Sequence, residues 1–357
     1  MFFINHLRDQ LSVQAISITA VLFLIIVIGP SLFLFARGQN VENIMNLCHF
    51  DHIKKFNKDG NLITSWGEKG SGNGQFLHPH GIALDSQADV YVTDEEKQEI
   101  QKFDANGTFL ARWGSAGIGE GQFSAKIEDI AVDASDKVYV VDYGNNRIEK
   151  FDNNGTFITM WGSFGNGSGQ FIRPWGITFD SIGNVYVTDL GNNRIEIFDS
   201  RGNFLAKWGE KGTDPGKFVH LHAIAIDNHD KLYVSDARQN SRISKFDNNG
   251  TFITMWGSFG NGSGQFNEQH GIAFDSMGRI YIADTKNSRI QIFTDKGKYL
   301  TMWGTRGAGD NQLLMPQDIA IDPDDNVYLT DVGDAHPEIG YIRDFLLKNR
   351  PLTQATC

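Results

Sequence analysis

Three histidines and a glutamate occupy one repeated position of this chain, and such side chains can bind a divalent metal ion. The position precedes a recurring apolar segment of the type Gly-Ile-Ala-x-Asp. Its six occupants are His80, Glu128, Trp175, His222, His270 and Gln317. Three histidines among six places are far more than an even spread of the chain's ten histidines would give. Imidazoles and a carboxylate that converge on one point could hold Zn²⁺ with a position left open for water or substrate.

The same residues support simpler interpretations, and the sequence leaves them open. A polar and aromatic surface can bind a small molecule, a peptide or a loop of a partner protein without any metal. Alternatively, the position tolerates almost any residue, and the domain is a purely structural surface module. We expect a ligand- or protein-binding module, with a zinc-dependent enzyme as the alternative, in which His80, His222 and His270 would be the metal ligands.

The elements that position these residues belong to a repeat of 47 or 48 residues. The dipeptide Trp-Gly begins at Trp66, Trp113, Trp161, Trp208, Trp256 and Trp303. An aspartate that ends a Val-Tyr-Val-Thr-Asp segment recurs in the same register at Asp94, Asp142, Asp189, Asp236, Asp284 and Asp331. Because a repeat of this length cannot bury its apolar face alone, the copies must pack against one another.

Each repeat contains four short β-rich segments separated by Asn, Asp and Gly, which are residues typical of turns. Four strands per repeat and six repeats predict an all-β, six-bladed β-propeller. The first segment is apolar throughout and predicts a strand buried on both faces, whereas the later segments alternate and predict half-exposed strands. Residues just before the innermost strand then surround the mouth of the central channel, which would bring the six residues named above together.

The ends of the chain predict a closed ring. An outer strand over residues 61–66 precedes the first inner strand, and the last repeat ends without its Trp-Gly strand, so the N-terminal strand should complete the last blade. Either Ile53–Phe56 or Tyr341–Phe345 could supply the third strand of blade six, and the second segment could instead form a short tail helix. Cys48 and Cys357 flank this closure and could pair in an oxidising compartment.

Some repeated residues are expected to be structural. An arginine follows the second-strand aspartate by five or six residues, which predicts an ion pair between the second and third strands. These pairs are Asp142–Arg147, Asp189–Arg194, Asp236–Arg242 and Asp284–Arg289. Residues 150–171 are also identical to residues 245–266, two blades apart. A unique site is therefore expected where the repeats differ.

This pattern resembles the NHL-repeat family of six-bladed propellers. The resemblance rests on Gly-Gln-Phe, as at residues 74–76, on Val-Tyr-Val-Thr-Asp and on Asn-x-Arg-Ile, and it covers roughly residues 50–345. It implies the fold but no particular activity, because propellers host unrelated functions.

A second resemblance concerns the mouth. Pro79-His80-Gly81 is similar to the zinc-histidine motif of peptidyl-α-hydroxyglycine amidating lyases, which are propellers with three such histidines on alternating blades. It implies Zn²⁺ held by histidines and catalysis by a tyrosine and an arginine, for which Tyr143 and Arg238 are the candidates. The chain departs from that family because only His80 follows a proline and its three histidines do not alternate between blades.

The N-terminal region predicts a membrane anchor, with a cleaved signal peptide as the alternative. Residues 10–36 contain no charged side chain and are long enough to cross a bilayer as a helix. Asn-Gly-Thr or Asn-Gly-Ser sequences fit glycosylation of an exported domain, although Asn-Gly is also a common hairpin turn. They begin at Asn106, Asn154, Asn166, Asn249 and Asn261.

We expect a single-pass membrane protein with its propeller on the extracytoplasmic side. The expected parts are a flank (residues 1–9), the transmembrane helix or signal anchor (10–36), a linker (37–49), the propeller (50–345) and a tail (346–357). The net charge of −11 argues against nucleic-acid binding, which needs clustered lysine and arginine. We expect a monomer.

Overall fold

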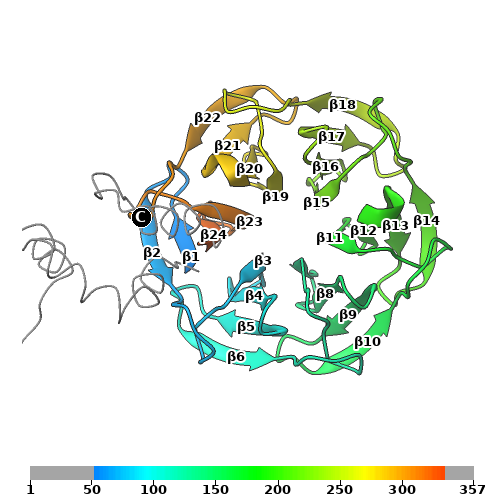
Figure 1. Cartoon of the computed structure of the whole chain (residues 1–357), viewed down its shortest axis with the longest axis horizontal. Coiled ribbons are helices and arrows are strands. Elements are labelled where there is room, and N and C mark those ends of the chain that lie inside the picture. The colour runs from blue at the N-terminus through cyan, green and yellow to red at the C-terminus, as the bar shows by residue number, and fades with distance from the viewer. Residues whose placement is uncertain (1–51, 334–357) are drawn as a thin grey trace, which may run out of the picture. The chain divides into compact units, whose positions relative to one another are not determined.

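The computed structural model describes residues 52–333, which form six four-stranded antiparallel sheets around a central channel (Figure 1). The predicted membrane segment, Cys48, Cys357 and Tyr341–Phe345 lie outside the described residues. Between residues 52 and 333, no helix is long and apolar enough to cross a membrane.

The blades follow one another along the chain. Blade one contains β3 (Pro79–Leu84), β4 (Val90–Asp94), β5 (Glu99–Phe103) and β6 (Phe109–Trp113). Blade two contains β7 (Ile130–Val132), β8 (Val138–Asp142), β9 (Arg147–Phe151) and β10 (Phe157–Trp161). Blade three contains β11 (Pro174–Phe179), β12 (Val185–Asp189), β13 (Arg194–Phe198) and β14 (Phe204–Trp208). Blade four contains β15 (Leu221–Ile226), β16 (Leu232–Asp236), β17 (Arg242–Phe246) and β18 (Phe252–Trp256); blade five contains β19 (Gln269–Phe274), β20 (Ile280–Asp284), β21 (Arg289–Phe293) and β22 (Tyr299–Trp303). Blade six combines β23 (Met315–Ile321) and β24 (Val327–Val332) with β1 (His52–Phe56) and β2 (Leu62–Trp66), and short 3₁₀ helices span Leu190–Asn192 and Thr285–Asn287.

The ring is closed by the N-terminal strands. The sheet of blade six has the order β2-β1-β24-β23, and β1 pairs antiparallel with β24, with Ile53 opposite Thr330. Ile53–Phe56 therefore lies in the third strand of blade six, one of the two alternatives that the sequence left open. Because the two ends of the propeller share this sheet, the ring cannot open between blade six and blade one unless β1 separates from β24.

Burial within a blade differs from the sequence prediction. The second and third strands, such as β12 and β13, are buried at every position rather than alternating, because neighbouring blades cover both of their faces. The innermost strand β11, expected to be buried on both faces, has several partly exposed residues, because one face borders the channel. The alternating pattern is confined to outer strands such as β10.

The tryptophans of the repeated Trp-Gly pack between blades. Trp113 at the end of blade one contacts Phe151 of blade two, with ring centroids 6.1 Å apart. It also lies against Gly155, which has φ +85° and where an added Cβ would lie 2.5 Å from Trp113 Cδ2. The hairpin turn needs glycine there both for its backbone angle and for the neighbouring ring.

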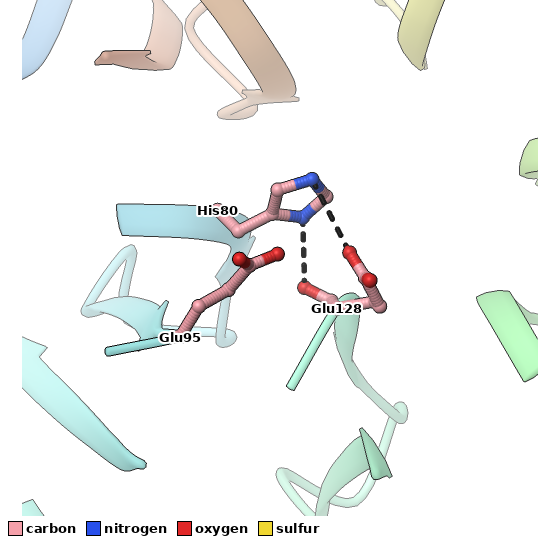
Figure 2. Close-up of side chains that lie close together, drawn as sticks. All are labelled: His80, Glu95 and Glu128. Atoms are coloured by element: carbon pink, nitrogen blue, oxygen red, sulfur yellow. Dashed lines mark hydrogen bonds and ion pairs between the residues drawn. The ribbon is translucent and has the colours of Figure 1, made fainter. Parts of the chain in front are cut away.

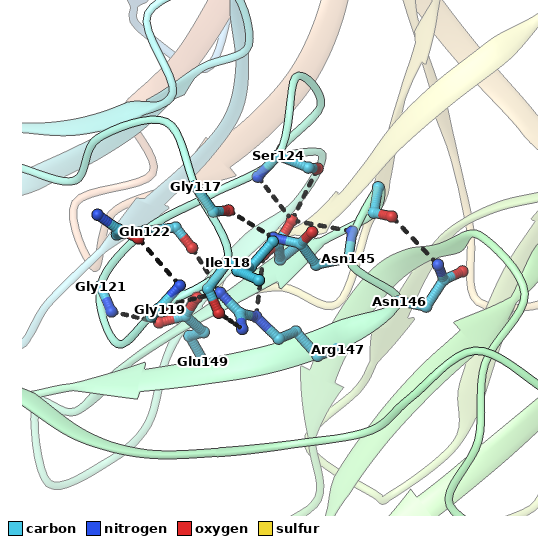
Figure 3. A network of polar contacts seen from close by, with 12 residues as sticks. Gly117, Ile118, Gly119, Gly121, Gln122, Ser124, Asn145, Asn146, Arg147 and Glu149 are labelled. Carbon is cyan, nitrogen blue, oxygen red and sulfur yellow. Dashed lines mark hydrogen bonds and ion pairs between the residues drawn. The ribbon is translucent and has the colours of Figure 1, made fainter.

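In blades two to five, the predicted aspartate–arginine pairs form part of larger networks that connect the blade to a neighbouring loop, as Figure 3 shows for blade two. Arg147 Nε donates to Asp142 Oδ2 at 3.1 Å, and the Arg147 Nη atoms donate to the carbonyl oxygens of Ile118, Gly119 and Gln122. The corresponding closest distances are 2.9 Å for Arg194–Asp189, 2.7 Å for Arg289–Asp284 and 3.5 Å for Arg242–Asp236. Through these hydrogen bonds, the arginines hold in place the loops that run from each Trp-Gly to the following Gly-Gln-Phe or its equivalent.

Candidate functional site

The six residues singled out at the mouth lie at one end of the innermost strands. His80, His222 and His270 are the second residues of β3, β15 and β19, and Trp175 has the same place in β11. Glu128 lies just before β7, and Gln317 is the third residue of β23. The propeller therefore brings residues from all six blades to one end of the channel.

The four aromatic side chains among these six residues form a cluster that we call the channel floor: His80, Trp175, His222 and His270. Trp175 stacks on His222 with centroids 4.4 Å apart, and His222 meets His270 edge-on at 4.4 Å. His80 lies 6.0 Å from His270 and 5.7 Å from Trp175. Trp175 and His270 are partly exposed, whereas His80 and His222 are buried. The mouth is thus filled by side chains rather than open.

A small cavity of about 10 Å³ adjoins the floor, which is room for about one water molecule. Its lining includes His80, Trp175 and His270 of the floor, together with Asp129 and Asp318. A ligand of larger size would therefore have to rest on the floor, unless these side chains move.

His80, Glu95 and Glu128 form a compact polar cluster between blades one and two (Figure 2). One ligand atom from each side chain lies within 4.8 Å of the others, and all three residues are buried. His80 Nδ1 lies 3.1 Å from the Glu128 carbonyl oxygen, so this nitrogen carries the hydrogen and donates it. His80 Nε2 faces Glu128 Oε2 at 3.4 Å.

Glu95 was not identified from the sequence. It directly follows β4, and because β3 and β4 run antiparallel, the end of β4 lies at the same end of the blade as His80. Its Oε2 lies 3.1 Å from His78 Nδ1. A comparison of the residues that follow each second strand, as was made for the residues before each first strand, would have drawn attention to this glutamate.

Burial governs the protonation of this cluster. It raises the pKa of Glu128 well above its ordinary value, and the nearby Glu95 carboxylate raises it further. Burial also lowers the pKa of His80. The Lys126 ammonium, half-exposed and 3.9 Å from Glu128 Oε1, opposes the increase at Glu128 without overcoming it. Without a bound cation, the pair therefore favours a neutral imidazole beside a protonated carboxyl group.

The three predicted histidine ligands are not arranged as a three-histidine centre. In the part of the chain that the structure describes, the single group of three metal-binding side chains within 4.8 Å of one another is the cluster that contains Glu95 and Glu128. Of the predicted set, only His80 belongs to it. His222 stacks on Trp175 instead, and burial together with His270 holds its pKa well below the ordinary value.

The two candidate catalytic residues occupy different surroundings. The Tyr143 ring meets Trp175 edge-on at 5.8 Å, so it borders the channel floor. Burial raises its pKa. Arg238 is largely exposed and its Nε donates to Glu268 Oε1 at 3.2 Å. Tyr143 thus contacts the mouth cluster, whereas Arg238 is held in an ion pair between blades four and five, from which its charge contributes to lowering the pKa of His222 and His270.

Asp129 and Asp318 form a second pair of carboxyl groups, deeper in the channel, that the sequence reasoning also missed. Asp129 Oδ2 accepts the Ile177 N–H at 2.9 Å, and Asp318 Oδ2 accepts the Ile82 N–H at 3.0 Å. Burial and the charge of Asp318 raise the pKa of Asp129 well above its ordinary value, and burial raises that of Asp318 to about 6. The corresponding position is glycine or alanine in the other four repeats, and this difference was the available signal.

Comparison with protein families supports the repeat assignment. The NHL repeat model matches residues 76–103, 125–151 and 266–293, and a family described as a 6-bladed beta-propeller matches residues 179–244. No curated protein matches the chain.

Solved structures with a similar fold have diverse names. A catalytically inactive virginiamycin B lyase from Staphylococcus aureus with quinupristin is 16% identical, with a TM-score of 0.53 over 78% of this chain and 81% of that one. A gluconolactonase from Xanthomonas campestris is 15% identical, with a TM-score of 0.54 over 73% and 88% of the two chains. A Bacteroides thetaiotaomicron protein of unknown function is 15% identical, with a TM-score of 0.56 over 80% and 74%. At these identities the likeness establishes the fold alone, and together with the family matches it shows that the chain contains NHL repeats and folds as a six-bladed β-propeller.

Proposed function

We propose that the protein is a recognition module that binds a small molecule or the end of a peptide on the channel floor. The observation that carries this proposal is the position of Trp175 at the channel mouth. All seven tryptophans are half-buried, but six belong to the repeated Trp-Gly and pack between blades, whereas Trp175 lies on His222 at the mouth. Its indole therefore places a large, half-exposed aromatic surface with a polar N–H at the channel mouth, where a ligand can stack on it.

Charged groups of both signs near the floor add specificity. Lys126 lies over the Tyr143 ring at 5.7 Å, and Glu268 contacts both Arg238 and Lys286. Because the cavity holds about one water molecule, the ligand is expected to lie flat on Trp175 and His270 rather than enter the channel. A flat or extended group with polar ends matches this surface best.

Fluorine NMR of the full-length chain labelled with 5-fluorotryptophan tests the proposal. Trp175→Phe identifies the Trp175 resonance, and a panel of short peptides and small carboxylic acids is then added. Binding at the floor should shift the Trp175 resonance and leave the six blade tryptophans unchanged. Ligands that shift only blade resonances, or a panel that shifts none, would favour another binding surface or a purely structural module.

Catalysis at the same mouth is the second candidate. It is favoured by the buried His80–Glu128 pair, in which a neutral imidazole and a protonated carboxyl group could exchange a proton with a substrate. The similar folds named as a lyase and a gluconolactonase are compatible with an enzyme, although their low identity transfers no activity.

The specific form of this candidate is a zinc-dependent lyase acting on a small peptide. Zinc-loaded protein should convert a peptide ending in α-hydroxyglycine to the peptide amide and glyoxylate, as mass spectrometry would detect, and Tyr143→Phe should slow the reaction. If wild-type protein produces amide no faster than buffer does, this candidate is excluded.

We further propose that the protein is anchored in the membrane by residues 10–36, with the propeller on the extracytoplasmic side. The support is the charge-free length of that segment, and the asparagines of all five Asn-Gly-Thr/Ser sequences are exposed on the propeller. The full chain should stay in the membrane pellet after alkaline extraction, and protease added to intact cells should degrade it. Release by alkali, or complete protection from protease, would contradict the anchor or the orientation respectively.

A further inference from the structure

We propose that His80, Glu95 and Glu128 form a binding site for one divalent transition-metal ion, with Zn²⁺ and Mn²⁺ as the cations that suit its ligands. This site goes beyond the proposed recognition function, because it needs only three side chains of this protein and no organic ligand. It also differs from the three-histidine centre predicted from the sequence, with which it shares only His80.

The spacing of the three side chains suits one small cation. Zinc–nitrogen and zinc–oxygen bonds are about 2.0–2.2 Å long, so neighbouring ligand atoms around one ion lie roughly 3–4 Å apart. His80 Nε2 and Glu128 Oε2 are already 3.4 Å apart, and each of the three side chains has one potential ligand atom within 4.8 Å of those of the other two. Small side-chain adjustments are therefore enough to bring all three into contact with one ion.

The hydrogen bonding of His80 leaves the correct nitrogen available. Nδ1 donates to the Glu128 carbonyl oxygen at 3.1 Å, which places the lone pair on Nε2. That nitrogen faces the Glu128 carboxyl group at 3.4 Å. A ligating histidine almost always donates its other N–H to a carbonyl or carboxylate, which fixes the ring in this way. His78, 3.1 Å from Glu95 Oε2, can orient the second ligand in the same manner.

The strongest indication is that the Glu128 carboxyl group is fully buried beside a second buried acidic side chain. Its side chain has no exposed surface, and within residues 52–333 neither of its carboxylate oxygens accepts a hydrogen bond. Glu95, a second buried carboxylate, lies beside it, and the nearest ammonium group, Lys126, is 3.9 Å away and half-exposed. Without a cation, burial keeps this carboxyl group protonated, whereas an ionised carboxylate at the same place needs a paired charge or a metal ion. A divalent cation would balance both carboxylates and occupy the free oxygens.

The types of donor atom narrow the choice of metal. An imidazole nitrogen suits Zn²⁺ and other transition metals better than Ca²⁺ or Mg²⁺, while two carboxylates are also good ligands for Mn²⁺. Three protein ligands would leave at least one position of the ion for water or for a ligand resting on the floor.

The test is direct titration of the purified full-length chain after treatment with a chelator. Zn²⁺ binding is measured by calorimetry and Mn²⁺ binding by electron paramagnetic resonance, with no organic ligand present. We expect one site per chain for each metal, and Glu95→Gln should weaken binding at least tenfold. Glu95→Gln is the key variant because it keeps the shape of a side chain at the edge of the cluster, and melting of the metal-free variant verifies its fold.

His222→Gln is the matched control, because His222 lies in the channel floor but not in the proposed site. It should bind either metal as tightly as the wild type does. Three results would overturn the proposal: no binding by folded wild-type protein, equal binding by wild type and Glu95→Gln, or loss of binding in His222→Gln with retention in Glu95→Gln. The last result would restore the three-histidine centre. Metal binding is measured without the ligands used in the fluorotryptophan experiment. The metal site and the proposed recognition function can therefore be refuted independently of each other.

Discussion

Replacing Glu149 by glutamine should stabilise the propeller at neutral and alkaline pH and have a smaller effect in acid. Glu149 lies on β9 with no exposed surface. Its Oε2 accepts the Gly121 N–H at 2.9 Å, and its Oε1 contacts Arg147 Nη2 at 2.6 Å (Figure 3). Burial raises the pKa of this carboxyl group from 4.5 to about 7, despite the opposing effect of Arg147.

The direction of the effect follows from proton linkage. Because the folded carboxyl group binds its proton more tightly than the unfolded one, its contribution to stability is complete below about pH 4.5 and is lost as the pH rises to about 7. At 1.36 kcal/mol per pH unit the full loss is roughly 3 kcal/mol, of which about 1 kcal/mol has already occurred at pH 5. Glutamine does not titrate, so the stability of Glu149→Gln relative to wild type should rise by about 2 kcal/mol between pH 5 and pH 8.

The molecule itself indicates that glutamine is tolerated at this position. Gln101 in blade one and Gln291 in blade five occupy it, and their Oε1 atoms accept the N–H groups of Gly74 and Gly264, as Glu149 accepts that of Gly121. The substitution should therefore keep the hydrogen bond to the loop while removing the titrating group.

Urea denaturation of the full-length wild type and Glu149→Gln at pH 5, 6, 7 and 8 measures this change. Glu120→Gln, which removes the same charge from an exposed site, is the control. A stability difference between Glu149→Gln and wild type that is independent of pH, or that shrinks as the pH rises, would refute the reasoning.

Three further substitutions test the packing of the ring. Gly107→Ala should lower the free energy of unfolding by about 2–4 kcal/mol, because Gly107 has φ +86° and its Cβ would lie 2.5 Å from Trp66 Cδ2. Gly183→Ala is the control: Gly183 has φ +85° but open space around it, so the substitution should cost only about 1 kcal/mol. Equal losses of stability in urea denaturation would contradict the role of the Trp66 ring. Arg194→Lys keeps the charge but cannot reproduce the hydrogen bonds to the Asn166, Gly167 and Gln170 carbonyls. It should therefore lower the free energy of unfolding by about 2–3 kcal/mol. An unchanged melting temperature would show that the ion pair with Asp189 is enough to stabilise this loop. Burial holds the pKa of His222 well below 6.5, so the unfolded chain binds this proton more readily and stability should fall as the pH drops below about 6.5. His222→Phe should reduce that fall between pH 6.5 and 5. Identical pH profiles of stability for the wild type and the variant would refute this prediction.

The sequence alone determined the architecture. Trp-Gly, the second-strand aspartate and the arginine after it recur in register because each makes the same contacts within its own blade or with the adjacent one, as Arg147 and Trp113 do. Such contacts repeat whenever the blade repeats, so their pattern is visible in one dimension. The N-terminal completion of blade six was predictable for the same reason, because a missing outer strand leaves an edge to be filled.

The candidate site was only partly accessible from the sequence. The position before each inner strand predicted which side chains gather at the channel, and His80 and Glu128 belong to the polar cluster found there. Glu95 comes from the end of a different strand, and Asp129 and Asp318 come from blades two and six. No periodic pattern marks these residues, since each occurs where the repeats differ.

Only the tertiary structure decided which of the gathered residues contact one another. Closure of the ring brings His222 onto Trp175 and leaves His80 beside Glu95 and Glu128, so a histidine-rich position forms an aromatic floor with one mixed cluster at its side. The full burial of β12 also depends on the neighbouring blades, because its last two residues, Thr188 and Asp189, are polar and yet buried. The physical reason is that pairings across a channel depend on side-chain size and direction once the ring is closed, and a linear repeat specifies neither.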